Sequence, residues 1–339
     1  MDWFERLTGF RENTYGDTRS KLTVDGGYLS SLVNGKRYGI GNFDLTALSD
    51  LRAAAKSAHA PPGKLKVQIV TGDVRPMHRD PTNVRALFQV ASQFNALEMV
   101  SPEITPEQGV TRYQSDRTQG PACAIAAGAA TIYRNYFVPV GNEHGQTATR
   151  QLDGLAEIGA DLSAALGQPV SALWEMKNGY ALCSRGGLQA IAAHLTELKS
   201  SELDALRAKL RIGLHSDIEV TESRGAEPGP LVSQAFCSAL PVGYSSVPKP
   251  LWEPFARLVL EAAYEATMLC GVLNSARARS NKVLLTSLGG GAFGNDEQWI
   301  HDSIARALDL FKRFALDVRL VSFGQPSRSF QAIADVWSL

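Results

Sequence analysis

The stretch VLLTSLGGGAFGNDEQWI, residues 283–300, shows most directly how this chain folds. Its apolar start predicts a buried strand that ends at Leu288, and a helix is expected to begin near Asp296. Four glycines lie between them, and glycine allows positive φ and leaves no Cβ between backbone and ligand. Backbone N–H groups in such a loop converge on phosphate oxygens at the carboxyl end of a strand, where α/β proteins usually bind ligands.

Two interpretations of this loop stay open from the residues alone. It binds a phosphate-bearing ligand, with Phe293 packed on a sugar or base, or it is a permissive turn with Phe293 folded inward. It is neither a Walker loop nor a dinucleotide fingerprint, because the Gly-Lys-Ser/Thr and the later acidic residue are missing. The predicted ligand-binding residues of this loop are Ser287, Gly289, Gly290, Gly291, Ala292, Phe293, Gly294 and Asn295.

Outward from this loop, apolar strands alternate with helices, which predicts an α/β fold with helices on both faces of a mixed central sheet. A hairpin is expected around Asn34-Gly35. We expect an N-terminal extension, 1–63, packed on a main domain, 64–339, with a helical insertion around 150–212. The further predicted strands are Leu65–Thr71, Ala86–Ala91, Gly179–Ser184, Ile212–Val220, Leu231–Leu240 and Asp317–Phe323; the predicted helices are Leu45–Ala58, Ala122–Tyr133, Pro254–Arg279 and Asp296–Phe314.

A second polar loop, 93–121, runs into an alanine-rich helix that opens at Gly120-Pro121. Long polar loops in compact domains tend to be functional, and a helix N-terminus favours an anion. The alternative is a structural loop in which Asp116 caps a turn; for the cluster as a whole, function is favoured. Its candidate residues are Asn95, Glu98, Tyr113, Asp116, Gln119 and Gly120.

The composition narrows the class of protein. Of the 339 residues, 44% are apolar, which is enough for a packed core. Lys+Arg and Asp+Glu both number 34, which argues against nucleic-acid binding through a bulk positive field. No apolar run is long enough for a membrane span, and the N-terminus is unlike a secretory signal, so we expect a cytoplasmic protein, with delivery into another cell as an effector left open.

The four cysteines lie far apart in apolar stretches, so buried reduced thiols are expected and a metal site is not. An oxygen-only metal site would leave no such spacing signal.

Gly72-Asp73 at a strand end, Phe94-Asn95-Ala96, the loop into the alanine-rich helix and the late GGGAFG together resemble the macrodomain superfamily over roughly 64–325. The strings FNALE, DRTQGPA, RNYF, CSALPVGYS and SLGGGAFGN resemble a divergent branch of it over most of the chain. That branch includes a Legionella effector that removes ADP-ribose from arginine on ubiquitin. The chain departs from the superfamily in lacking its Asn-Ala-Ala-Asn string and the GGG run of its first ligand loop.

The resemblance implies a macrodomain-like three-layer α/β/α fold that binds ADP-ribose. It places Gly72 and Asp73 at the adenine, Asn95 at the distal ribose, and Gly289–Asn295 at the diphosphate with Phe293 against the ribose. It further implies a hydrolase of mono-ADP-ribose on a protein side chain, with arginine favoured and ubiquitin as one carrier. The expected partners are ADP-ribose or an ADP-ribosylated protein, with neither nucleic acid nor membrane, and no cofactor or metal is expected.

Hydrolysis at C1 of the distal ribose passes through an oxocarbenium-like state, by analogy with glycosides. It needs a carboxylate that orients water or steadies positive charge, and a proton for the leaving group. Asp116, Glu98 and Asp296 are the candidates, because each lies in or beside a predicted ligand loop. Two alternatives remain, namely a reader that binds ADP-ribosylated protein without cleaving it, and an enzyme for a free ADP-ribose derivative.

Three other polar positions have ordinary interpretations that are favoured. Arg134 is expected to pack under the sheet at a helix end, with the steering of an anion as the alternative. His215 and Asp217 share a face of a predicted strand by alternation, and a polar strand end is favoured over a catalytic base with its orienter. Tyr244 is expected in a structural turn, rather than beside a base.

Overall fold

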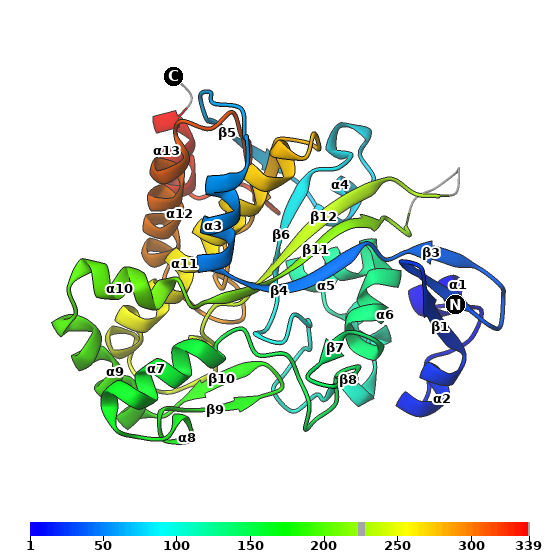
Figure 1. Cartoon of the computed structure of the whole chain (residues 1–339), viewed down its shortest axis with the longest axis horizontal. Helices are drawn as coiled ribbons and strands as arrows, with labels where there is room; N and C mark the ends of the chain where they lie inside the picture. The colour runs from blue at the N-terminus through cyan, green and yellow to red at the C-terminus, as the bar shows by residue number, and fades with distance from the viewer. Residues whose placement is uncertain (223–227, 338–339) are drawn as a thin grey trace.

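A seven-stranded mixed sheet forms the centre of the computed structural model, which describes residues 1–222 and 228–337 (Figure 1). In spatial order its strands are β4 (Asn42–Ala47), β11 (Arg211–Glu219), β12 (Leu231–Cys237), β6 (Leu87–Ala91), β13 (Lys282–Leu285), β14 (Asp317–Ser322) and β5 (Lys66–Thr71).

The strand directions bring three carboxyl ends together. β11 is antiparallel to both β4 and β12, whereas β12, β6, β13, β14 and β5 run parallel. The central strands are buried on both faces, which explains why β6 is apolar except for the buried Gln89, as is typical of a covered parallel strand. Since β12 and β13 both pair in parallel with β6, the carboxyl ends of these three strands lie side by side at one edge of the sheet.

Helices cover both faces of this sheet. The long helix α11 (Lys249–Ala276) packs on one face with α3 (Leu48–Ser57) and α12 (Glu297–Phe311). The other face carries α4 (Val74–Met77), α5 (Gln119–Ala126) and α6 (Gly128–Tyr136), which close over a second apolar cluster. Figure 1 shows these layers, and they confirm the predicted three-layer α/β fold with a mixed sheet.

Residues 156–207 form a separate group of elements beside the sheet. Their hairpin, β9 with β10, is antiparallel, and the ion pair between Arg207 and Glu261 joins the last helix of the group to α11 at 2.6 Å. The elements are α7 (Ala156–Leu166), α8 (Val170–Leu173), β9 (Trp174–Lys177), β10 (Tyr180–Cys183), α9 (Arg185–Glu197) and α10 (Ser200–Arg207).

The N-terminal residues pack on α5 and α6 through an apolar cluster of their own. The hairpin predicted around Asn34-Gly35 is confirmed, because its two strands pair antiparallel across that turn. The predicted boundary at residue 63 is not a boundary of the sheet, however, since β4 is one of its edge strands and α3 covers it. The N-terminal elements are α1 (Trp3–Thr8), α2 (Tyr15–Ser20), β1 (Leu22–Asp25), β2 (Tyr28–Ser31) and β3 (Arg37–Gly39).

Several predicted boundaries were wrong for local reasons. The helix expected from Leu45 begins at Leu48, because the preceding residues pair with β11. The alanine-rich helix begins earlier, at Gln119, and Ala127 divides it because its φ of −116° and ψ of 58° are not helical. The remaining short elements are η1 (Pro81–Asn83), η2 (Pro106–Gln108), η3 (Thr111–Ser115), β7 (Pro139–Val140), β8 (Glu143–His144), η4 (Val242–Tyr244) and α13 (Arg328–Trp337).

All four cysteines are free and buried, as expected. None of the helices in the part of the chain that the structure describes is long and apolar enough to cross a membrane.

Candidate active site

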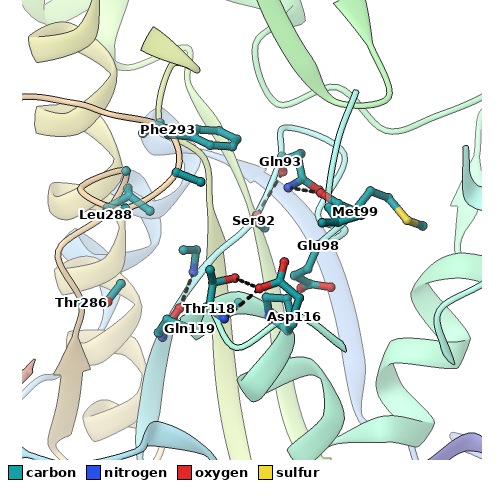
Figure 2. Close-up of a pocket in the computed structure, with 18 of the residues that line it drawn as sticks. Ser92, Gln93, Glu98, Met99, Asp116, Thr118, Gln119, Thr286, Leu288 and Phe293 are labelled. Atoms are coloured by element: carbon teal, nitrogen blue, oxygen red, sulfur yellow. Dashed lines mark hydrogen bonds between the residues drawn. The ribbon is translucent and has the colours of Figure 1, made fainter. Parts of the chain in front are cut away.

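A cavity of about 160 Å³ lies where β6, β12 and β13 end (Figure 2). Its position agrees with the rule that α/β sheets bind ligands beyond the carboxyl ends of their strands. One wall is the glycine loop after β13, and the opposite wall is built from the segments around Glu98 and Asp116. The lining residues are Ala91, Ser92, Gln93, Glu98, Met99, Val100, Asp116, Thr118, Gln119, Gly120, Pro121, Tyr180, Ala239, Tyr244, Thr286, Ser287, Leu288, Gly289, Gly291, Ala292 and Phe293.

Two positions in the glycine loop require glycine. Gly289 has a φ of +74°, and a Cβ there would lie 2.5 Å from the Cβ of Ala239. Gly294 has a φ of +67° and lies against the backbone of Gly243. Gly291 is different, since its φ is not positive and a Cβ there would meet nothing within 4 Å. The loop therefore takes its shape from Gly289 and Gly294 and presents Gly291 to open space.

The same loop carries main-chain donors that nothing in the described chain uses. Three of its N–H groups close the turn internally, since those of Gly290, Gly294 and Asn295 donate to carbonyls of the loop. Within the described chain, four others find no acceptor, and all four residues line the cavity: Gly289, Gly291, Ala292 and Phe293. N–H groups grouped in this way can bind anionic oxygens, and the predicted binding of a diphosphate here stays a prediction.

The opposite wall begins where α5 meets β6. A Cβ on Gly120 would lie only 2.0 Å from the carbonyl oxygen of Ala91, so the helix start sits directly against the strand end. Gln119 fastens this junction, because its amide accepts from the N–H of Ala91 and donates to the carbonyl of Gln89, both at 2.8 Å. The first-turn N–H groups of α5 have no acceptor inside the helix, and the helix end carries partial positive charge.

Glu98 is a carboxylate held almost entirely out of solvent. Its side chain is 1% exposed, yet it lines the cavity. Burial raises the pKa of Glu98 to about 7, against the opposing effects of Arg134 and of the Tyr113 hydroxyl, which favour the ionised form. A carboxyl group with a pKa near neutrality is suited to general acid–base chemistry.

Arg134, from α6, pairs with Glu98 from behind the cavity wall. Its Nη2 donates to Oε1 of Glu98 at 3.3 Å, and the Arg134 side chain is fully buried. The interpretation of Arg134 as a buried helix-end residue is confirmed, and its ion pair with Glu98 is a role that the sequence did not indicate.

Asp116 lies beside Glu98 on this wall and is half-buried (Figure 2). Its Oδ1 accepts from both the N–H and the hydroxyl of Thr118, at 2.8 and 2.7 Å, which holds the carboxylate at the start of α5. The turn cap expected as the structural alternative is therefore observed for Asp116, and the residue also lines the cavity, whereas its catalytic role stays a prediction.

Three aromatic rings gather at the cavity. Tyr180 of β10, Tyr244 of η4 and Phe293 of the glycine loop have ring centroids 5.2 to 5.7 Å apart. Phe293 is half-buried against its neighbours and also lines the cavity, so its ring both packs inward and offers a surface to a ligand. The turn expected at Tyr244 is observed, and the residue reaches the site as well.

Some predicted site residues lie outside the lining. Asp296 caps α12 by accepting from the N–H of Gln298 and lies 3.7 Å from Lys249, so its predicted catalytic role finds no support in the geometry. Asp73 caps α4 in the same way, and it is exposed. The predicted adenine contact of Gly72 and Asp73 stays a prediction.

Other predicted residues support the site from behind. Asn95 is fully buried, with its amide bonded to Gln151 and to the N–H of Leu97, so both ends of the side chain are already paired. Tyr113 lies beneath Glu98 and accepts from its N–H at 3.0 Å. Gly290, Gly294 and Asn295 belong to the glycine loop without lining the cavity, and Asn295 holds the loop by donating to Leu240.

Sequence reasoning missed other lining residues. Ser92 and Gln93 directly follow β6, and the rule that strand ends form sites would have found them. Tyr180 carried no signal, because it comes from the hairpin at 174–183 and reaches the cavity only through the packing of that segment.

The prediction that His215 and Asp217 share a strand face was wrong. The pairing of β11 shifts between His215 and Ile218, and Asp217 has a φ of 54°. Asp217 pairs with Arg279 at 3.0 Å, whereas His215 is buried beside Arg134.

Residues 1–222 and 228–337 contain no group of three or more His, Cys, Asp or Glu side chains that could hold a metal ion. The expected absence of a metal stays a prediction.

No protein-family model matches the chain, and no curated protein matches it. Among solved structures, it is similar to a poly(ADP-ribose) glycohydrolase from Deinococcus radiodurans in complex with ADP-ribose, with 11% identity and a TM-score of 0.48 over 88% of this chain and 96% of that chain. It is also similar to a poly(ADP-ribose) glycohydrolase from Thermomonospora curvata bound to the inhibitor ADP-HPD, with 12% identity and a TM-score of 0.43 over 95% and 97%. Because both TM-scores are below 0.5, we base the proposed function on the residues of this chain.

Proposed function

We propose that the chain is an ADP-ribosyl hydrolase that removes mono-ADP-ribose from a modified protein side chain. One observation carries the proposal: the glycine loop, which holds four main-chain N–H groups without acceptors in the described chain, lies across a single cavity from Glu98 and Asp116. The donors suit a diphosphate, and the carboxylates suit the breaking of a glycosidic bond.

The reaction needs one water molecule and two proton transfers. Water adds to C1 of the distal ribose, and the bond from C1 to the side-chain nitrogen breaks. One proton of the water passes to Glu98, whose pKa of about 7 lets it accept that proton near neutrality, and Glu98 then returns the proton to the leaving nitrogen. Asp116, on the same wall of the cavity, steadies the positive charge that develops on the ribose.

Arginine is the linkage that we favour. The leaving group is then a guanidinium, whose positive charge suits a wall with two carboxylates. The likeness of strings such as FNALE and SLGGGAFGN to the arginine-specific branch supports the same choice, and it makes ADP-ribosylated ubiquitin the first protein substrate to test.

Calorimetry followed by a release assay tests the proposal. ADP-ribose is expected to bind at micromolar strength or better and AMP much more weakly, because AMP lacks the diphosphate and the distal ribose. Equal affinities would exclude the diphosphate site. ADP-ribose release is then measured from arginine-, glutamate- and serine-linked substrates. Binding without release from any of them identifies a reader, and turnover of free ADP-ribose derivatives alone identifies the third function.

A further inference from the structure

Arg134 makes more contacts around Glu98 than an ordinary ion pair needs. Its Nη2 donates to the Glu98 carboxylate at 3.3 Å and to the Thr131 hydroxyl at 3.2 Å, and its Nε donates to the carbonyl of Ala96 at 3.0 Å. The guanidinium also lies 3.8 Å from the centre of the Phe236 ring. One planar group thus holds both the Glu98 carboxylate and the backbone two residues before it.

Burying a guanidinium in this place lowers the stability of the fold, so its presence calls for a functional explanation. Arginine stays charged in proteins, and taking both charges of an ion pair out of water usually costs more than their attraction returns. The side chains of Arg134 and Glu98 are only 0% and 1% exposed. An apolar pair of the same shape would pack here without that cost, so stability alone does not explain the pair.

The two carboxylate oxygens of Glu98 have different surroundings. Oε1 accepts from Arg134, whereas Oε2 has no hydrogen-bond partner among the residues that the structure describes. Oε2 is itself buried, so a carboxylate oxygen without a partner lies in the wall of the cavity that Glu98 lines.

We propose that Arg134 is the positioning residue of Glu98: its guanidinium anchors Oε1 and the adjoining backbone, and so fixes the unpaired Oε2 in the wall of the cavity with a charge that favours the carboxylate. This inference rests on the proposed function, which makes Glu98 the residue that handles the proton.

None of the other titratable groups that face this pair supplies the positive charge that Arg134 supplies. Tyr113 of η3 and Cys123 of α5 are neutral near pH 7, because burial raises the pKa of both well above its usual value. His215 of β11, on the far side of Arg134, is also neutral, because burial lowers its pKa and Arg134 lowers it further. Asp116, an acidic residue, lies on the same wall. Arg134 is therefore the one cation that faces Glu98 among the described residues.

The first test titrates Glu98 without substrate. The carboxyl band of Glu98 is followed with pH by infrared difference spectroscopy, with Glu98→Gln as the reference that identifies it. Removing an opposite charge at this range is expected to raise the pKa of Glu98 by about one to three units in Arg134→Met. Arg207→Met removes a guanidinium from the pair with Glu261, outside the cavity lining, and should leave the band unmoved. An unchanged titration in Arg134→Met overturns the proposal.

The second test uses Arg134→Lys, which keeps the charge and loses the planar fork, and which serves if Arg134→Met does not fold. The expected result is a Glu98 titration close to that of the parent, with kcat lower by at least about tenfold and KM little changed, because only orientation is lost. Parental kcat in this variant overturns the positioning role. A parent that releases no ADP-ribose, yet shows the titration shift in Arg134→Met, overturns the proposed function and leaves the Arg134–Glu98 coupling standing.

Discussion

Glu98 and Asp116 differ in what surrounds them, and this sets what each can do. Glu98 is buried against the cation of Arg134 and has one oxygen without a partner, whereas Asp116 is half-buried and bonded to Thr118. When two carboxyl groups lie close together in different environments, one commonly transfers protons while the other stabilises charge.

Glu98→Gln should keep most of the affinity for ADP-ribose and lose turnover by about 10² to 10⁴, the usual effect of removing one general acid or base. Asp116→Asn should also lose turnover while keeping its bonds to Thr118. Asp296→Asn is the control, because Asp296 caps α12 outside the cavity and asparagine caps a helix equally well. Release of ADP-ribose per folded molecule is the measurement, and full activity in both Glu98→Gln and Asp116→Asn would remove the catalytic assignment.

The raised pKa of Glu98 also makes stability depend on pH. A carboxyl group whose folded pKa lies above its ordinary value of 4.5 binds its proton more tightly in the folded protein. Its contribution to stability is complete below pH 4.5 and is lost as the pH rises through 7. The unfolding free energy of the parent should therefore fall relative to that of Glu98→Gln across this window.

Urea unfolding at several pH values between 4 and 8 measures this difference. Glu175→Gln, which changes an exposed glutamate of β9, is the matched control. If the parent and Glu98→Gln keep a constant difference over the window, then Glu98 is not the perturbed group.

At the scale of elements, the loop after β13 gives a sharp contrast between neighbouring glycines. A valine at position 291 has open space and an ordinary φ, so the fold should survive while a branched side chain enters the cavity beside the N–H donors. Affinity for ADP-ribose should fall by about tenfold or more, which corresponds to a loss of at least about 1.4 kcal/mol of binding free energy. Gly289→Val should instead disrupt the loop, because of its φ of +74° and the contact with Ala239.

Calorimetry and circular dichroism on both variants separate loss of binding from loss of structure. Gly186→Val, in α9, is the control, since a Cβ there also meets nothing within 4 Å. Unchanged affinity in a folded Gly291→Val protein would show that the loop is only a turn.

At the scale of the whole molecule, the N-terminal residues stabilise the wall that carries Glu98. The carboxylate of Glu12 accepts from the N–H groups of Val110 and Thr111, at 2.9 and 2.6 Å, and from the Tyr136 hydroxyl at 2.8 Å. These bonds fix the start of η3, the turn that places Tyr113 beneath Glu98.

Glu12→Ala should destabilise the protein by about 1–3 kcal/mol, because it leaves these donors without an acceptor. Turnover should fall with it, although Glu12 lies outside the cavity lining. Glu5→Ala removes an N-terminal glutamate whose partner, Arg11, is exposed, and should cost only about 0–1 kcal/mol. Denaturant unfolding and the release assay on both variants check this, and equal effects would argue against a link between the N-terminal residues and the site.

The sequence by itself determined six of the seven strands of the sheet, all but β4, together with the glycine loop and Glu98, Asp116 and Asp296 as candidates. These features depend on local periodicity, on glycine's freedom at positive φ, and on strand ends, all of which are written in neighbouring residues. Only the tertiary structure decided that Arg134, 36 residues further along, pairs with Glu98, that Tyr180 enters the cavity, and that Asp296 stays outside it. Those outcomes depend on how α6, β10 and α12 pack against the sheet, and packing between distant segments leaves no periodic mark in a single chain.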